Sequence, residues 1–321
     1  MMSLAQTGFG QQSNAMTHSD PITCAYGDLF IDYPLANYTS WRVGGSADRL
    51  FRPWDLQGLI AFLRELPETE PLVWLGMGSN LLIRDKGIRG TVINVRGRLN
   101  LIRMENGPTV YAEAGVLCPH LARFCSEQGL AGAEFFAGIP GSVGGALAMN
   151  AGAFGGETWS MVDEVSTVHR NGACWIRTRD DFEIGYRSVE GPENEFFVAA
   201  KFMLKTGDGV ESRKRIKALL AKRVASQPLN LPSCGSVFRN PPGDYAARLI
   251  EASGIKGYTI GGACVSEKHA NFIVNQGRAR AADIEKLIEF VQSEVERKQG
   301  VKLIPEVRII GESSVGGEAE S

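Results

Sequence analysis

The sequence predicts an α+β protein built from two parts. Helix-type hydrophobic spacing and short β-branched runs both occur along the chain, but they do not alternate as a regular βαβ series would. With 321 residues, the chain is long enough for roughly two domains at ~150 residues each. A turn-rich break at 206–209 divides it, so we expect a larger part over 25–206 and a smaller part over 207–311.

In the larger part, the spacing of apolar residues predicts helices and strands without any internal repeat. Helices are expected around 56–63 and around 117–125, the second stopping near Gly129. Strands are expected at 72–75, 91–95, 110–114, 164–168 and 196–204, where β-branched and aromatic residues gather.

The smaller part combines three helical segments with two strands. The helices are expected at 212–224, 245–253 and 282–298, and the strands at 271–275 and 307–310. The first of these helices is basic, so we expect its charged face to be solvated. In the last helix, the buried stripe is expected to consist of Ile284, Leu287, Ile288, Val291 and Val295.

Both ends of the chain are polar and lack hydrophobic periodicity. We expect residues 1–24 to be a disordered or vector-derived tail and residues 312–321 to be a second tail. No apolar run approaches the ~20 residues of a membrane-spanning helix, and the start lacks the pattern of a signal peptide. The expected location is therefore the cytoplasm, with no membrane partner.

Charge and cysteine content exclude several classes of partner. The net charge of −2 provides no overall positive field that would favour nucleic acid, so an anionic ligand must be held by local dipoles and a few arginines. The six cysteines contain no C-x-x-C pair, and the four histidines do not cluster with them. We therefore expect reduced thiols and no metal site.

Two glycine-rich loops are the strongest local indication of a ligand. The first, at 75–80, follows a predicted strand, and Gly76 and Gly78 allow the backbone to turn successive N–H groups toward one anion. The second, at 138–145, runs into a stretch of small residues, where phosphates would lie at a helix N-terminus.

Neither loop matches a known nucleotide signature. The chain has no G-x-x-x-x-G-K-[ST] motif, and the first loop lacks the third glycine of the dinucleotide fingerprint. For either loop alone, a tight turn without a ligand is an equally good interpretation. The two loops together favour phosphate binding, since the first offers Ser79 and Asn80 as donors and the second offers Ser142 and leads to Asn150.

Longer motifs then match a known family in the family's order. The matching stretches are 39–45, 75–85, 131–157, 186–188, 235–241, 261–275 and 305–308, and they cover about 38–311. The chain resembles the UDP-N-acetylenolpyruvoylglucosamine reductases. The short interval from Ser236 to Glu306 is similar to their compact subclass, which lacks a substrate-capping insertion.

The resemblance implies a fold, a cofactor and a reaction. The fold would be a two-part FAD-binding domain of the p-cresol methylhydroxylase and vanillyl-alcohol-oxidase type, followed by a smaller α+β substrate-binding domain. The family uses FAD and NADPH to reduce UDP-N-acetylglucosamine enolpyruvate to UDP-N-acetylmuramate in peptidoglycan precursor synthesis. In that reaction flavin N5 takes a hydride from NADPH and passes it to the enolpyruvyl group, whose C2 then takes a proton. We expect these two substrates as partners and a monomeric protein.

Three catalytic residues follow from the same resemblance. Arg187 offers a fixed fork of donors to a carboxylate that gains negative charge. Ser236 matches the family's proton donor. Glu306 matches the third active-site residue and would either polarise the enolpyruvyl group or relay a proton, if burial raises its pKa.

The resemblance also implies binding residues. Those expected to bind the cofactor are Leu75, Gly76, Met77, Gly78, Ser79, Asn80, Leu81, Ile139, Pro140, Gly141, Ser142, Gly144, Gly145, Val198 and Arg308. Those expected to contact the substrate are Asn240, Lys268 and His269, and Lys222 or Arg223 could reach the diphosphate of UDP. Taken singly, such residues are more often surface cations, turn residues or structural histidines.

Two other functions stay open from the sequence. One is a flavin-dependent oxidase of the same superfamily; such enzymes often tether the flavin through histidine, and the two glycine loops contain none. The other is a non-catalytic nucleotide-binding module, which would not require Arg187, Ser236 and Glu306 to converge.

Overall fold

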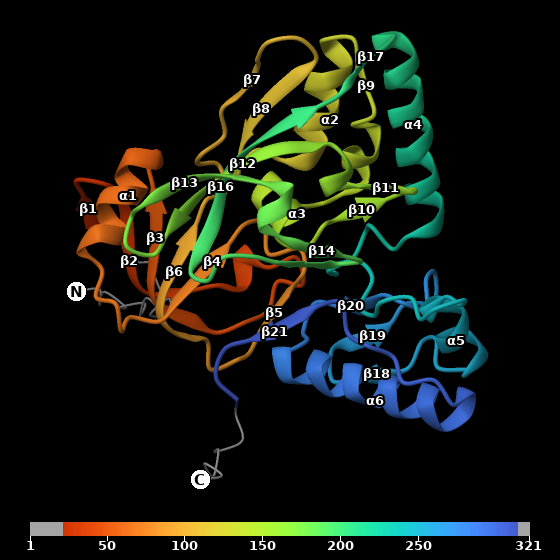
Figure 1. The fold of residues 1–321 in the computed structure, drawn as a ribbon. Coiled ribbons are helices and arrows are strands. Elements are labelled where there is room, and N and C mark those ends of the chain that lie inside the picture. The colour runs from red at the N-terminus through yellow and green to blue at the C-terminus, as the bar shows by residue number, and fades with distance from the viewer. Residues whose placement is uncertain (1–21, 314–321) are drawn as a thin grey trace, which may run out of the picture.

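Two five-stranded sheets and a smaller C-terminal unit make up residues 22–313, which the computed structural model describes (Figure 1). The mixture of layers confirms the α+β prediction. The tail expected over 1–24 ends in a strand, β1 (Ile22–Cys24), and its remaining residues, like most of the tail expected at 312–321, lie outside the described part. None of the helices within 22–313 combines the length and the apolar character that a bilayer crossing requires.

The first sheet carries the first glycine loop at the end of one of its strands. Its order is β1, β2 (Gly27–Pro34), β3 (Ser46–Pro53), β6 (Ile88–Asn94) and β4 (Leu72–Leu75). β6 pairs in parallel with both β3 and β4. Helix α1 (Leu56–Glu65) is capped by Asp55, whose carboxylate accepts from the Gly58 amide, and it buries three leucine and isoleucine side chains as its spacing predicts.

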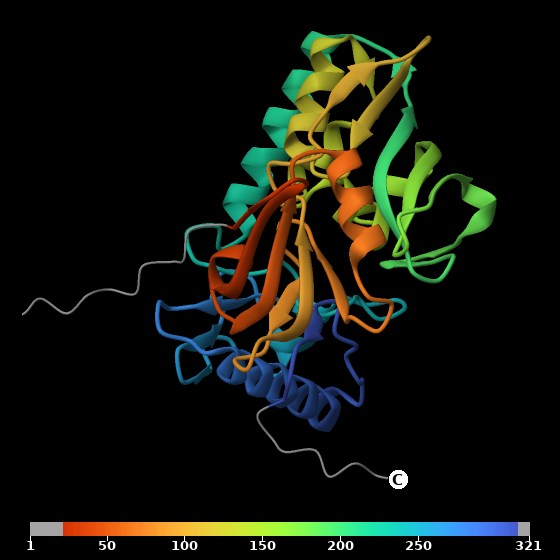
Figure 2. The same cartoon turned by 90° about the vertical axis from the view of Figure 1, so that its left-hand side faces the viewer.

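The second sheet is antiparallel and is covered by helices. Its order is β13 (Cys174–Thr178), β12 (Val162–His169), β16 (Glu195–Met203), β8 (Thr109–Glu113) and β7 (Ile102–Met104). Helices α2 (Cys118–Glu127), α3 (Val143–Ala148) and α4 (Gly209–Ser226) accompany it. Helix α4 lies beside α2 in both views (Figure 1, Figure 2).

Helix α4 therefore packs with the larger part of the chain, whereas the expected division at 206 assigned it to the smaller part. Its charged face is solvated as predicted, because only Ser212 of the helix is buried. Leu220 and Val224, which share the apolar stripe of this helix, stay 39% and 60% exposed. The helix consequently gains little from burial of this stripe.

The C-terminal unit is a small sheet packed on a long helix. The sheet order is β18 (Thr259–Ile260), β19 (Ala263–Val265) and β20 (Ile273–Asn275), with helices α5 (Ala246–Ala252) and α6 (Ala281–Gln299). The predicted stripe of α6 is confirmed, since all five of its residues are buried. Gly300 ends α6 in the left-handed conformation, with φ at 68°.

Several contacts join the C-terminal unit to the larger part. The last strand, β21 (Arg308–Ile310), pairs in parallel with β5 (Leu81–Ile83), which directly follows the first glycine loop. Trp41 is fully buried in the core of the C-terminal unit, and its indole donates to the Ile273 carbonyl at 2.7 Å. The Asp85 carboxylate accepts from the first two amides of α6 at 2.9 and 3.0 Å. The two parts thus share buried surface and a helix cap.

Short elements complete the fold. They are the strand pairs β9 (Leu130–Ala131) with β17 (Lys205–Thr206), β10 (Gly152–Ala153) with β11 (Gly156–Glu157) and β14 (Glu183–Gly185) with β15 (Ser188–Glu190), and the 3-10 turns η1 (Ala36–Tyr38), η2 (Glu134–Gly138), η3 (Thr158–Ser160) and η4 (Arg179–Asp181).

Candidate functional site

The two glycine loops lie directly against each other. A Cβ atom placed on Gly76 would be 2.8 Å from Ser142 Oγ, and one placed on Gly141 would be 3.4 Å from Ser79 Oγ. The first contact is too close for any residue with a side chain, unless Ser142 moved. Glycine therefore allows the loops, which are separated by more than sixty residues of sequence, to approach to contact distance.

The first loop also presents unused hydrogen-bond donors. Within residues 22–313, the backbone amides of Met77, Gly78 and Ser79 donate to no protein acceptor. Buried or half-buried amides are normally paired, so successive unpaired ones indicate a binding site for an anion. The Ser142 side chain caps α3 by accepting from Gly145 N at 3.5 Å.

A cavity of about 300 Å³ lies between the loops and the last strand, and we call it the cofactor cavity. Of the residues predicted to bind the cofactor, it is lined by Gly76, Met77, Gly78, Ser79, Asn80, Leu81, Ile139, Gly141, Ser142, Gly145 and Arg308. An adjoining cavity of about 340 Å³ is lined by Leu75 and Gly144. Val198 lines neither cavity, because its side chain is buried in the core between α1 and the two sheets.

Gly78 offers a sharp test of the loop. Its φ is +61°, and a Cβ atom there would be 2.0 Å from the Tyr38 carbonyl oxygen. We expect Gly78→Ala to lower the free energy of unfolding by more than about 2 kcal/mol, since strain of about 1–2 kcal/mol from the left-handed backbone adds to a backbone clash. Denaturant unfolding measures this loss, and flavin absorbance after purification measures retention of the cofactor.

Gly97→Ala is the matched control for this prediction. Gly97 has φ at +70°, but nothing lies within 4 Å of an added Cβ. The Gly97→Ala variant should therefore lose only about 1–2 kcal/mol of unfolding free energy, from backbone strain, and should keep its flavin. Equal losses in the two variants would show that the contact with Tyr38 is unimportant.

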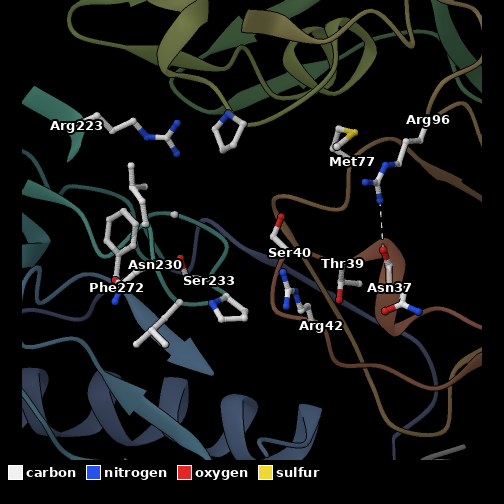
Figure 3. A pocket seen from close by; sticks show the side chains of 15 residues that line it. Asn37, Thr39, Ser40, Arg42, Met77, Arg96, Arg223, Asn230, Ser233 and Phe272 are labelled. Atoms are coloured by element: carbon white, nitrogen blue, oxygen red, sulfur yellow. Dashed lines mark hydrogen bonds between the residues drawn. The ribbon is translucent and has the colours of Figure 1, made fainter. Parts of the chain in front are cut away.

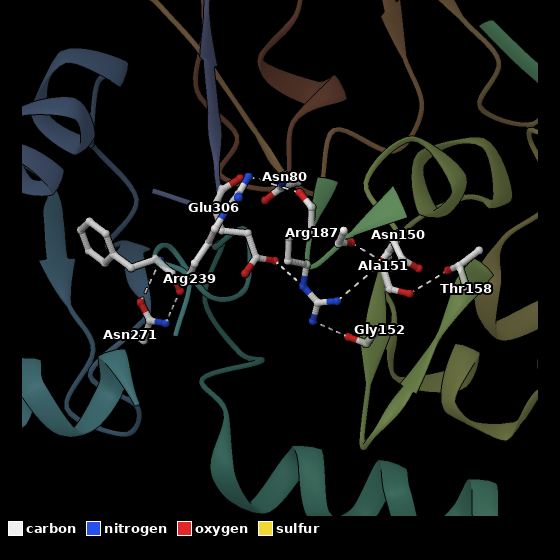
Figure 4. A network of polar contacts seen from close by, with 11 residues as sticks. Asn80, Asn150, Ala151, Gly152, Thr158, Arg187, Arg239, Asn271 and Glu306 are labelled. Atoms are coloured by element: carbon white, nitrogen blue, oxygen red, sulfur yellow. Dashed lines mark hydrogen bonds and ion pairs between the residues drawn. The ribbon is translucent and has the colours of Figure 1, made fainter. Parts of the chain in front are cut away.

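Beyond the loops, Arg187 and Glu306 form the centre of a polar network (Figure 4). Arg187 Nε lies 3.0 Å from Glu306 Oε1, and the two side chains are only 16% and 12% exposed. The Nε–H does not point at this oxygen, so the contact is an ion pair without a hydrogen bond from that nitrogen. The donor therefore stays available in a buried position.

The backbone around Arg187 holds its side chain in one orientation. Its Nη1 and Nη2 donate to the carbonyls of Asn150 and Gly152 at 3.2 and 2.8 Å. Arg187 and Asn150 have φ of 56° and 44°, which is uncommon for residues other than glycine. Such strained residues gather at functional sites, where the surrounding structure maintains them.

Glu306 is tied to the first glycine loop and to the segment that carries Ser236. Asn80 Nδ2 donates to the Glu306 carbonyl at 3.1 Å, and the Glu306 amide donates to Val237 O at 2.7 Å. Asn271 fixes the same segment, because its side chain exchanges hydrogen bonds with both backbone groups of Phe238 (Figure 4). Loop, serine and carboxylate are thus positioned by one hydrogen-bonded assembly.

Ser236 shares a second cavity with Arg187 and Glu306. This cavity has a volume of about 550 Å³, and we call it the substrate cavity. It adjoins the cofactor cavity, since Asn80, Ile139, Arg187 and Glu306 line both. Within residues 22–313 the Ser236 hydroxyl has no protein hydrogen-bond partner, which leaves it available to a ligand.

The residues expected to contact the substrate divide into two groups. Asn240, His269 and Arg223 line the substrate cavity, together with Pro140 of the second glycine loop. Lys268 is not among the lining residues, and its Nζ donates instead to the Val224 carbonyl on α4 at 2.6 Å. Its structural role is to join the C-terminal unit to α4.

Burial determines the ionisation of two groups in the substrate cavity. It raises the pKa of the Glu306 carboxyl above the ordinary 4.5, against the opposing effect of the Arg187 and Arg239 guanidiniums. It also lowers the pKa of His269 below 6.5, so that the neutral imidazole is favoured near pH 7. Glu306 therefore has the raised proton affinity that a proton relay requires.

The raised pKa of Glu306 predicts a particular dependence of stability on pH. A carboxyl whose pKa is raised by folding stabilises the folded state below pH 4.5, and this contribution is lost as the pH rises through the raised pKa. Relative to Glu306→Gln, the wild-type protein should therefore lose unfolding free energy over that window. Denaturant unfolding between pH 4 and pH 8 measures the difference.

An exposed glutamate provides the control. Glu68→Gln alters a solvent-exposed carboxylate that lines neither cavity, and the stability of this variant should follow that of the wild type across the pH range. A constant difference between wild type and Glu306→Gln would contradict the raised pKa.

Unpaired buried nitrogen atoms concentrate around the two cavities. Within residues 22–313, the buried side-chain nitrogens without a hydrogen bond include Arg187 Nε, Arg239 Nε, His269 Nδ1 and Trp74 Nε1, each on a residue that lines one or both cavities. Leaving such a group unpaired costs about 1–3 kcal/mol, so ligands of matching polarity are expected there. These atoms and the close-packed glycines fit a polar dinucleotide cofactor and an anionic substrate.

Sequence reasoning missed two of these residues as candidates. Arg239 lines the cofactor cavity, and its Nη2 donates to the Arg187 carbonyl at 3.2 Å. It directly precedes Asn240 in the matched stretch 235–241, which was the available signal. Trp74 is the residue before the first glycine loop, but its place in an apolar strand favoured a purely structural interpretation.

Comparison with known proteins then identifies the class and the family. A family model described as an FAD binding domain matches residues 47–176, and one described as the C-terminal domain of UDP-N-acetylenolpyruvoylglucosamine reductase matches residues 227–310. The protein therefore belongs to the class of FAD-dependent flavoproteins.

Whole-chain relatives give the family. The chain is 62% identical over 280 residues to the UDP-N-acetylenolpyruvoylglucosamine reductase of Methylococcus capsulatus, covering 87% of this chain and 92% of that protein. It is 56% identical to the Coxiella burnetii reductase over 306 residues, covering 89% and 97%. A solved structure of the Thermus caldophilus reductase matches with a TM-score of 0.76 and 33% identity, covering 88% of this chain and 98% of that one. The chain belongs to the UDP-N-acetylenolpyruvoylglucosamine reductase family.

Proposed function

We propose that this protein catalyses the NADPH-dependent reduction of UDP-N-acetylglucosamine enolpyruvate to UDP-N-acetylmuramate through bound FAD, in peptidoglycan precursor synthesis. The observation that carries the proposal is the convergence of Arg187, Ser236 and Glu306 on one cavity beside the paired glycine loops. A non-catalytic nucleotide-binding module would not need this convergence. The proposal includes a monomer that acts in the cytoplasm, without nucleic acid or membrane as partner.

The residues of the two loops would hold the cofactor. The unpaired amides of Met77, Gly78 and Ser79 suit a diphosphate, and the Ser79 hydroxyl supplies a further donor. Arg308 lines the cofactor cavity at the start of β21, next to Leu81 in the parallel register. When bound there, FAD would supply hydride transfer between NADPH and the enolpyruvyl group.

Arg187 would stabilise the charge that develops on the substrate. Its guanidinium is oriented by two backbone carbonyls, and its buried Nε–H has no hydrogen-bond partner within the described chain. A donor that is already oriented before the reaction does not have to reorganise, so it stabilises the carboxylate as soon as the carboxylate gains charge. The enolpyruvyl carboxylate is the natural acceptor.

Ser236 would then give a proton to the substrate carbon. A serine hydroxyl is a weak acid, so it suits only a strongly basic centre such as the carbanion-like C2 of the reduced enolpyruvyl group. Glu306 lies in the same cavity, and its raised pKa supports a role in relaying that proton. Its ion pair with Arg187 couples the two roles.

Flavin absorbance followed in two anaerobic steps tests the proposal. The purified protein should be yellow, should bleach when NADPH is added, and should recover its colour when the enolpyruvyl substrate follows. A colourless protein that gains no flavin absorbance on addition of FAD would contradict a flavoenzyme of either kind. Bleaching that only oxygen reverses would favour an oxidase of the same superfamily instead.

A further inference from the structure

Behind the first glycine loop lies a third cavity, distinct from the cofactor cavity and the substrate cavity. It has a volume of about 570 Å³ and opens between the loop and the segment 229–233 (Figure 3). Three arginines line it, Arg42, Arg96 and Arg223, and we call it the arginine cavity. They come from three separate stretches of the chain, so the charge is gathered by the fold and not by a basic run.

The charge of the arginine cavity is not neutralised by the protein. No aspartate or glutamate is among its lining residues. Within residues 22–313, the Arg42 side chain donates to no protein atom, and the Arg96 side chain donates only from Nη1, to the Asn37 carbonyl at 3.3 Å. Both guanidiniums therefore keep donors for an anionic ligand. In Figure 3 they lie on the same side of the hollow, opposite Arg223.

The arginine cavity adjoins both cavities described above. It shares Met77 with the cofactor cavity, and it shares Pro140, Arg223, Gly235 and Phe272 with the substrate cavity. A ligand that occupied the substrate cavity and was longer than that cavity would therefore extend among the arginines. Of the two nucleotides in the proposed reaction, NADPH carries an additional phosphate monoester at the end far from its reacting ring.

The backbone that carries Arg42 and Arg96 is held in place. The Ser40 amide donates to the Gly78 carbonyl at 3.0 Å, which fastens the turn before Arg42 to the first glycine loop. The Arg96 amide donates to Asn94 Oδ1 at 3.3 Å, directly after β6. A rigid backbone limits the cost of ordering the two long side chains on a phosphate.

We propose that the arginine cavity receives the 2′-phosphate of NADPH, and that Arg42 and Arg96 thereby make the enzyme select NADPH over NADH. This inference rests on the proposed function. A guanidinium presents a planar fork that matches phosphate oxygens, and a nearby arginine is the usual means by which proteins accommodate this phosphate. NADH lacks the group and gains nothing from either residue.

The test compares both dinucleotides in the first half-reaction. Anaerobic flavin reduction is followed in the wild type, in Arg42→Gln, in Arg96→Gln and in the double variant. Loss of charge-assisted hydrogen bonds should raise the KM for NADPH by about tenfold to a hundredfold in the double variant, while kcat stays unchanged. The KM and kcat for NADH should both stay at their wild-type values. Arg123→Gln removes another exposed arginine, on α2 and outside the three cavities, and should behave as the wild type.

Binding of adenosine 2′,5′-bisphosphate gives a readout that does not depend on turnover. Calorimetry should show tighter binding of this probe than of adenosine 5′-monophosphate to the wild type, and loss of that difference in the double variant.

Two results would overturn the proposal: an equal rise in the KM values for NADPH and NADH in the double variant, or equal binding of the bisphosphate and the monophosphate by the wild type. If the variants differ from the wild type only in slower reoxidation by the enolpyruvyl substrate, the proposal is also overturned, because that result assigns the cavity to UDP. Failure of NADPH and NADH alike to bleach the wild-type flavin would count against the proposed function, and the calorimetric comparison would still decide the role of the arginines.

Discussion

Ser236→Ala is expected to keep flavin reduction by NADPH at the wild-type rate while slowing reoxidation by the enolpyruvyl substrate by about 10³-fold, within the usual range for loss of a general acid. The hydroxyl is needed only after the hydride has reached the substrate, so the first half-reaction should not depend on it. Ser236 lines the substrate cavity but not the cofactor cavity, which agrees with a role confined to the second step. Stopped-flow absorbance of the flavin measures both steps in one sample.

A second serine provides the control for this experiment. Ser293 is exposed on α6, and Ser293→Ala should leave both half-reactions unchanged. If Ser236→Ala reoxidises as fast as the wild type, the proton must come from another group. Loss of flavin binding in Ser236→Ala would instead show that Ser236 supports the fold of the segment around it.

Arg187→Lys should slow the second half-reaction by about 10²-fold, the scale seen when one oriented donor to a developing negative charge is removed. A lysine keeps the positive charge but cannot reach the Asn150 and Gly152 carbonyls and Glu306 at the same time, because it lacks the planar fork. The expected loss is therefore one of orientation. The rate of reoxidation at saturating substrate measures it directly.

Arg179→Lys tests whether any such exchange is harmful. Arg179 also donates to a buried backbone carbonyl, that of Trp159 at 2.8 Å, but it does not line the cavities. Its replacement should leave reoxidation unchanged. If Arg187→Lys slows reduction by NADPH and reoxidation by the substrate equally, Arg187 supports the site as a whole and does not act on the enolpyruvyl carboxylate.

Local features of the fold were predictable because local sequence determines them. The stripe of α6 and the strand at 72–75 follow from the spacing of apolar residues within a few turns or pleats. Long-range pairings were not predictable in this way. The parallel pairing of β21 with β5 and the burial of Trp41 in the C-terminal core depend on which surfaces meet after the chain has folded.

The candidate site shows the same limit. Motifs identified the glycine loops, and the chemistry of Arg187 and Glu306 required that they meet, as they do at 3.0 Å. The position of Lys268 in a motif could not reveal its hydrogen bond to the Val224 carbonyl, because the flexible side chain of an exposed lysine can donate to any carbonyl within reach. Nor could it reveal the burial of Val198, because a strand residue faces one side or the other according to a register that only the full sheet fixes.

The pairing of β21 with β5 has a consequence for the order of events during synthesis. Domains fold as the chain emerges from the ribosome, N-terminal segments first. Here the first glycine loop leads into β5, whose partner strand begins only two residues after Glu306, close to the end of the described chain. A nascent protein that has already formed both sheets would still lack one wall of its cofactor cavity. Stable capture of the flavin should therefore wait until residues 308–310 have been made, and a ribosome stalled before codon 308 should carry a colourless chain.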